Sequence, residues 1–158
     1  MIQRLQSLFL LGVVLCMSMT AFLPAWNYTF NGGSITLKMG NLTYSNSESI
    51  VLHQVNMMYL LGIAITAGLV ALINIFKFNN RKLQLKIAMI NSLLIIIYMV
   101  LVYIFVPKQA IELLGNDIPD FHFQLGTFFT IPALLFNILA RVFIIKDEDL
   151  VKSVDRIR

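Results

Sequence analysis

The stretch Ile87–Val106 reads IAMINSLLIIIYMVLVYIFV, and it decides the class of this protein. The stretch contains no charged residue. As a helix rising about 1.5 Å per residue, it is long enough to cross the roughly 30 Å apolar core of a bilayer. Because backbone polar groups inside lipid must be satisfied within the segment, the stretch predicts a transmembrane helix.

Three more apolar segments of similar length lie at residues 5–25, 57–76 and 125–145. The whole chain has 158 residues, of which 58% are hydrophobic and only 13% are charged, whereas about a quarter of a soluble domain is charged. We therefore expect one all-α membrane domain over residues 1–158, built as a four-transmembrane-helix bundle. A cleaved signal peptide is the alternative for residues 5–25. Its long apolar run and the lack of a clear small-residue cleavage site disfavour that interpretation.

The basic residues divide unequally between the two sides of this arrangement. Only Lys38 and Lys108 fall on one side. The other ten share the opposite side: Arg4, Lys77, Arg81, Lys82, Lys86, Arg141, Lys146, Lys152, Arg156 and Arg158. Since cytoplasmic segments of membrane proteins are enriched in Lys and Arg, this bias predicts that both chain termini are cytoplasmic. It also explains the net charge of +4 without a nucleic-acid partner.

The outer segment at residues 26–56 has a β pattern. Apolar and polar residues alternate on both sides of a turn at Asn31-Gly32-Gly33, which predicts a β-hairpin, with a third short strand near Leu42–Tyr44. We expect a polar loop at Ser45–Ser49. The hairpin and its third strand would form a small extracytoplasmic cap between the first and second helices.

Two prolines punctuate the later part of the chain. Pro107 is expected to end the third span, because proline lacks a backbone N–H and clashes with the preceding turn. The segment after it could form a short interfacial helix at Gln109–Leu114. Pro132 is expected to kink the fourth span.

Polar residues within the spans are the first candidates for a functional site. The polar residues that we select all lie in the cytoplasmic half of the predicted bilayer: Asn74, Asn91, Asn137 and Arg141. One interpretation is a pocket that opens to the cytoplasm, as in a small transporter or channel component. The simpler interpretation is hydrogen bonding between helices, with Arg141 extending towards the interface.

The tail at residues 146–158 is a second candidate site. Apolar residues recur in it at helical spacing between charged ones, which predicts an amphipathic helix. The charged residues that could dock a membrane or cytoplasmic protein are Lys146, Asp147, Glu148, Lys152, Asp155, Arg156 and Arg158. We favour a non-enzymatic accessory or scaffold protein that binds its partner through this tail. The oligomeric state does not follow from the sequence.

The sequence offers no recognisable chemistry for catalysis. It has no nucleophile–base pair, phosphate-binding loop or cofactor motif, so we expect neither an enzyme nor a cofactor. The residues His53, His122, Asp117 and Asp120 lie in the outer segments, but their spacing matches no metal-binding pattern. Cys16 is the only cysteine, so no disulfide can form within the chain.

The two ends of the chain carry its most distinctive sequence. It begins with Met1-Ile2-Gln3-Arg4, and its tail contains Asp147-Glu148, Leu150-Val151 and Asp155-Arg156-Ile157-Arg158. This pattern resembles the four-helix bacterial membrane proteins grouped as domain of unknown function 4293. The resemblance implies a location in the bacterial inner membrane, and it supplies no activity.

Overall fold

The computed structural model describes residues 3–30, 33–46, 50–114 and 122–155. It is mostly helical, with a small antiparallel sheet. The element order begins with α1 (Gln3–Phe22), and α2 spans Met58–Phe76. α3 spans Arg81–Val100, and α6 spans Thr130–Asp155. α3 is extended through Gln109, and α6 is preceded by a short helical piece that begins at Leu125. With these extensions the described residues contain four helices long and apolar enough to cross a membrane.

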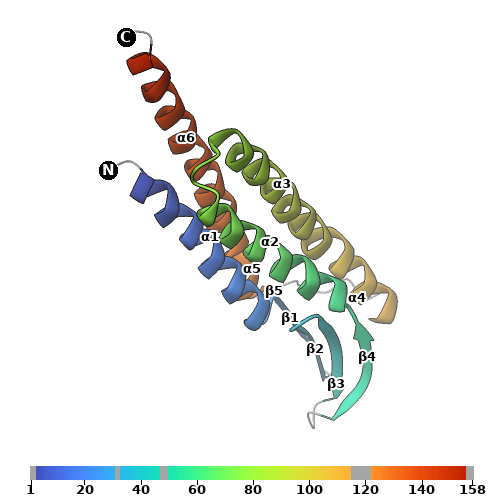
Figure 1. Cartoon of the computed structure of the whole chain (residues 1–158). Coiled ribbons are helices and arrows are strands. Elements are labelled where there is room, and N and C mark those ends of the chain that lie inside the picture. Colours follow the sequence, from blue (N-terminus) through green and yellow to red (C-terminus); the bar gives the residue numbers. More distant parts are fainter. Residues whose placement is uncertain (1–2, 31–32, 47–49, 115–121, 156–158) are drawn as a thin grey trace.

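The four long helices pack in a closed ring. α1 contacts α2 and α6, and α3 contacts the same two helices from the other side. Small residues allow the close approaches: a Cβ atom on Gly12 of α1 would lie 2.8 Å from Cδ2 of Phe136 on α6. In Figure 1 the starts of α1 and α3 lie at the same end as the late part of α6, and the sheet lies at the opposite end. The molecule therefore has a terminal end and a sheet end.

The sheet has five strands in the order β4-β3-β2-β1-β5. The strands are β1 (Trp26–Phe30), β2 (Gly33–Lys38), β3 (Asn41–Asn46), β4 (Val51–Asn56) and β5 (His122–Phe123). The predicted hairpin is confirmed as β1 and β2, in which Trp26 pairs with Leu37. The third strand is confirmed but longer than predicted, because Ser45 and Asn46 belong to it. The loop prediction was wrong for these two residues, and residues 47–49 lie outside the described part.

Alternation gives the sheet two unlike faces. On one face the apolar side chains of Trp26, Ile35, Leu37 and Leu42 are at most 2% exposed. The other face carries short hydroxyl side chains that bond across strands: Thr36 Oγ1 lies 2.7 Å from Thr43 Oγ1. The apolar face joins the core formed by the helices. The sheet is therefore packed on the ends of the helices rather than on a core of its own.

The prediction that Pro107 ends the third span was wrong. α3 continues through a π-helical turn, η1 (Leu101–Phe105), into α4 (Val106–Leu114), so Pro107 lies within a helix. In the turn the N–H of Val106 donates to the carbonyl of Leu101, five residues earlier. The wider turn changes the hydrogen-bond register just before Pro107, where an α-helix would need the missing N–H of the proline. The predicted short helix at Gln109–Leu114 is present as the end of this extension.

The fourth span is divided near Pro132, where a kink was predicted. α5 (Leu125–Phe128) is separated from α6 by Phe129. The ring of a helical proline clashes with the carbonyl four residues earlier, which here belongs to Phe128. The start of the span is hydrogen-bonded instead to the backbone that follows α1: the N–H of Gly126 donates to the carbonyl of Pro24 at 3.0 Å.

Candidate functional site

Buried amide side chains gather towards the terminal end of the helices. Asn74, Asn91 and Asn137 are fully buried, and Gln84 is 1% exposed. They come from three helices: Asn74 from the last turns of α2, Gln84 and Asn91 from one face of α3, and Asn137 from the first third of α6. We call these four residues the amide cluster.

Asn137 makes the best-formed contacts of the amide cluster. Its Nδ2 atom donates to the carbonyl of Ala88 at 2.8 Å and to Oγ of Ser92 at 2.7 Å. Asn91 Nδ2 approaches Asn137 Oδ1 at 3.4 Å, which is at the outer limit for a hydrogen bond. The structure thus brings together two of the residues selected from sequence, and their bonds join α3 to α6.

The other half of the amide cluster is less well satisfied. Gln84 Nε2 donates to the backbone carbonyl of Asn74 at 3.3 Å. Both polar side-chain atoms of Asn74, Oε1 of Gln84 and Oδ1 of Asn91 are buried without a hydrogen-bond partner among the described residues. Buried polar groups normally have partners, so these atoms mark a place where a water molecule or a polar ligand would be stabilised.

Gln84 was missed by the sequence reasoning. It lies seven residues before Asn91, two helical turns away and therefore on the same face of α3, which was the available signal. Its proximity to Arg81 and Lys82 placed it in the basic loop in the sequence interpretation. Arg141 lies one turn beyond Asn137, and its partly exposed side chain has a buried Nε without a partner among the described residues.

The prediction that the tail is helical is confirmed, because α6 continues to Asp155. Asp147 is not free in this helix: its carboxylate lies 2.9 Å from Nη2 of Arg81, and its backbone carbonyl accepts from Nη1 of Arg81 at 2.7 Å. Lys146 is exposed, with Nζ 5.6 Å from the centre of the Phe143 ring. Asp155 and Lys152 lie in the helix. Arg156 and Arg158 lie outside the described residues.

No group of three metal-ligating side chains occurs in the part of the chain that the structure describes. His53 is exposed on β4, and His122 is exposed on β5. Asp117 and Asp120, the acidic residues considered with them, lie outside the described residues. The amide cluster and the tail therefore remain the two candidate sites.

Comparison with known proteins gives a family and no activity. No curated protein matches the chain. A family model described as Domain of unknown function (DUF4293) matches residues 2–157. The match covers nearly the whole chain, including both distinctive ends. The resemblance seen in the sequence is thereby confirmed, and the chain belongs to the DUF4293 family.

Proposed function

We propose that this chain is an integral protein of the bacterial inner membrane that spans it four times, with its sheet outside and both termini in the cytoplasm. The four apolar helices support membrane insertion. Exposed Lys77, Lys82, Lys86 and Lys146 all lie near the terminal end, which supports the orientation because basic residues favour the cytoplasmic side. In this arrangement the four helices form a transmembrane bundle and the sheet is its extracytoplasmic cap.

Within the membrane, the protein acts as a non-enzymatic accessory or scaffold protein that docks a partner through its tail. The observation that carries this proposal is the length of α6. Its 26 residues span about 39 Å, more than the roughly 30 Å apolar core of a bilayer. The last turns therefore extend past the lipid as a helix, and the Arg81–Asp147 contact holds their base against α3.

Crosslinking in native membranes tests the docking proposal. The full chain is compared with a chain that ends at Ile145, after both are found in the membrane fraction. Both are crosslinked in the membrane and then extracted with a mild detergent. We expect a protein that is crosslinked to the full chain and absent from the truncated one. Recovery of the same proteins with both chains would exclude the tail as the docking site.

A second candidate function, a small transporter or channel component, is favoured by one observation. The unpartnered amide atoms of Asn74 and Asn91 are what a hydrated pathway through Asn74, Asn91, Asn137 and Arg141 would need. Water-soluble thiol reagents distinguish the two functions in a background that carries Cys16→Ala. Asn91→Cys is modified if the amide cluster is hydrated, whereas the buried Ile95→Cys, one turn along α3, serves as the dry control. Equal protection of both positions would exclude the pathway.

A further inference from the structure

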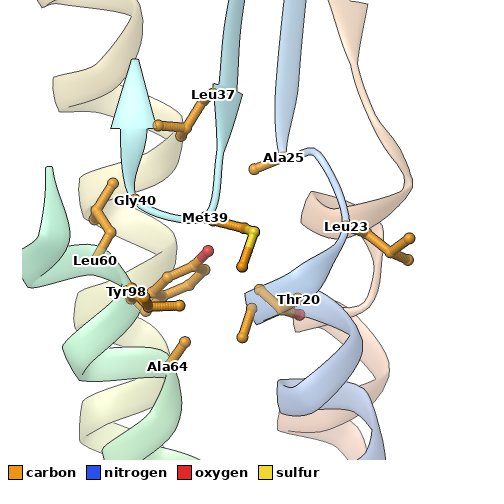
Figure 2. Close-up of a pocket in the computed structure, with 11 residues that line it drawn as sticks. Thr20, Leu23, Ala25, Leu37, Met39, Gly40, Leu60, Ala64 and Tyr98 are labelled. Atoms are coloured by element: carbon orange, nitrogen blue, oxygen red, sulfur yellow. The ribbon is translucent and has the colours of Figure 1, made fainter. Parts of the chain in front are cut away.

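A small cavity lies where the sheet meets the end of α1 and the start of α2, and Tyr98 of α3 is one of its walls (Figure 2). The side chain of Tyr98 is only 4% exposed, and Figure 2 shows its hydroxyl directed towards the side chain of Met39. No group in the part of the chain that the structure describes hydrogen-bonds to this hydroxyl. Because a buried tyrosine hydroxyl normally has a partner, the cavity contains a polar group that needs a ligand.

The last turn of α1 brings unpaired backbone carbonyls to the same cavity. The carbonyl of Thr20 has no helical donor, because the residue four positions later is Pro24, which lacks an N–H. The carbonyl of Ala21 has none either, because the N–H of Ala25 donates to the carbonyl of Leu37 at 2.9 Å instead. Thr20 and Ala21 both line the cavity. The end of α1 therefore leaves two carbonyl acceptors that a bound hydrogen-bond donor would satisfy.

The size and the chemistry of the cavity select its ligand. The cavity offers about 10 Å³ to the centre of a water-sized sphere, which is close to the room that one water molecule needs. A buried water also needs about two to four polar partners, and the two carbonyls and the Tyr98 hydroxyl supply them. The hydroxyl of Thr20 donates to the carbonyl of Cys16 at 2.9 Å, so its oxygen is a further acceptor. None of the lining residues is acidic, which disfavours a cation.

We propose that one ordered water molecule binds in this cavity and joins the sheet end of α1 to α3. The water donates to the carbonyls of Thr20 and Ala21, where the end of a helix carries partial negative charge, and it bonds to the hydroxyl of Tyr98. α1 and α3 lie on opposite sides of the helix ring, so the water links two helices that are not neighbours in it. Met39 and Gly40 of the β2–β3 turn close the site. The inference goes beyond the proposed function and does not depend on the membrane orientation.

Contacts between water and alanine methyl groups test the proposal on the full chain in detergent micelles. Ala25 and Ala64 line the cavity and are at most 4% exposed. Ala67 and Ala71, further along α2, are fully buried and do not line it, so they are matched dry controls. With isotope-labelled alanine methyls, we expect nuclear Overhauser cross-peaks to water at the first pair and none at the second. No cross-peak at Ala25 and Ala64, or equal cross-peaks at all four, would overturn the proposal.

A variant that fills the cavity separates water from exchanging hydroxyl protons. Ala64→Val adds methyl groups at the cavity wall and keeps the hydroxyls of Thr20 and Tyr98, so it should remove the cross-peak at Ala25. A cross-peak that persists at full strength would come from the hydroxyl protons and would overturn the proposal. Loss of the wild-type cross-peak in a buffer without Na⁺ and K⁺ would overturn it in favour of a bound cation.

Tyr98→Phe gives an independent measurement, because a bonded and an unbonded hydroxyl predict different results. If water bonds to the hydroxyl, its removal costs a hydrogen bond and should lower the thermal unfolding midpoint by about 3 °C. If the hydroxyl has no partner, phenylalanine removes an unsatisfied group, and the midpoint stays or rises. Tyr59→Phe is the control, because Tyr59 is 46% exposed on α2, and it should leave the midpoint unchanged. An unchanged or higher midpoint for Tyr98→Phe would overturn the proposal.

Discussion

At the scale of single residues, Asn137 is the polar side chain with the most consequence for stability. Replacing it by alanine removes two donated hydrogen bonds and leaves polar groups of α3 unpaired. Hydrogen bonds between membrane helices contribute about 0.6 kcal/mol on average, so with the void left behind we expect Asn137→Ala to lower the free energy of unfolding by about 1–2 kcal/mol. Denaturant titration in detergent measures this change.

Leu135→Ala is the control for this prediction, because Leu135 is 55% exposed on the same helix. It should change the free energy of unfolding by no more than about 0.5 kcal/mol. If Asn137→Ala lowers the free energy of unfolding no more than Leu135→Ala does, the hydrogen bonds of Asn137 make no net contribution to stability. The long 3.4 Å contact with Asn91 also predicts weak coupling between the two asparagines in a double-mutant cycle.

Gly126 makes the tightest backbone approach that a helix of this molecule shows in its described part. A Cβ atom there would lie 2.7 Å from the carbonyl oxygen of Pro24 and 2.8 Å from that of Leu23. Because these are backbone atoms, no side-chain movement can relieve the overlap. We expect Gly126→Ala to destabilise the protein by about 2–3 kcal/mol, measured by thermal unfolding. Gly62→Ala should be neutral or stabilise by up to about 1 kcal/mol, and equal effects of the two changes would contradict this account.

At the scale of elements, the β2–β3 turn offers a stabilising substitution. Met39 occupies the left-handed backbone region, which costs most residues about 1–2 kcal/mol and asparagine less. Met39→Asn should therefore raise the free energy of unfolding by about 1 kcal/mol. A lower midpoint would show that the side chain of Met39 matters more to the fold than its backbone strain.

The base of the tail is a second element with a separable contact. Arg81 makes two contacts with Asp147, one to the carboxylate and one to the backbone carbonyl. Asp147→Asn keeps the contact to the backbone carbonyl, whereas Arg81→Met removes both contacts. Arg81→Met should therefore loosen the start of the tail more than Asp147→Asn does. Amide hydrogen exchange around Asp147 measures the loosening, and Lys82→Met at the adjacent exposed position is the control. Equal exchange in Arg81→Met and Lys82→Met would mean that this half-buried ion pair does not hold the tail.

The elements also show which parts of the fold the sequence could predict. The four helices follow from the length of their apolar runs, and the β1–β2 hairpin follows from alternation on both sides of a glycine turn. β4 was missed because its sequence, VLHQVN, does not alternate between apolar and polar residues. The structure agrees with this pattern, since the first four residues of the strand are all exposed. β5 is only two residues long and forms by pairing with Trp26 and Asn27, far away in the sequence. The continuation through Pro107 was missed because the π-helical turn is a local solution that residue preferences do not reveal.

The candidate site was predictable only in part, for a similar reason. Residues four apart on one helix can be placed on one face from sequence, as with Asn137 and Arg141. Partners on different helices depend on how the helices pack, so the bonds from Asn137 to Ala88 and Ser92 could not be foreseen. The same limit applies to Gln84, whose contact with Asn74 crosses the tight connection between α2 and α3.

At the scale of the whole molecule, the two ends differ in character. The terminal end carries the amide cluster, the exposed lysines and the tail, whereas the other end carries the five-stranded sheet, whose apolar face packs on the helices. The two candidate sites selected from sequence therefore lie towards one side of the proposed membrane, and the sheet lies towards the other.

Cysteine labelling in intact cells tests that orientation directly. Cys16, the only cysteine, is buried, so the wild type should give little background. A membrane-impermeant maleimide should label Gln54→Cys, exposed on β4 of the cap, and should label Lys82→Cys only after the membrane is permeabilised. The physical reason is the basic residues of the terminal end, which resist transfer across a membrane. The reverse pattern would place the tail outside and exclude a cytoplasmic partner. Labelling of both positions in intact cells would show that the chain does not separate its two ends across a membrane.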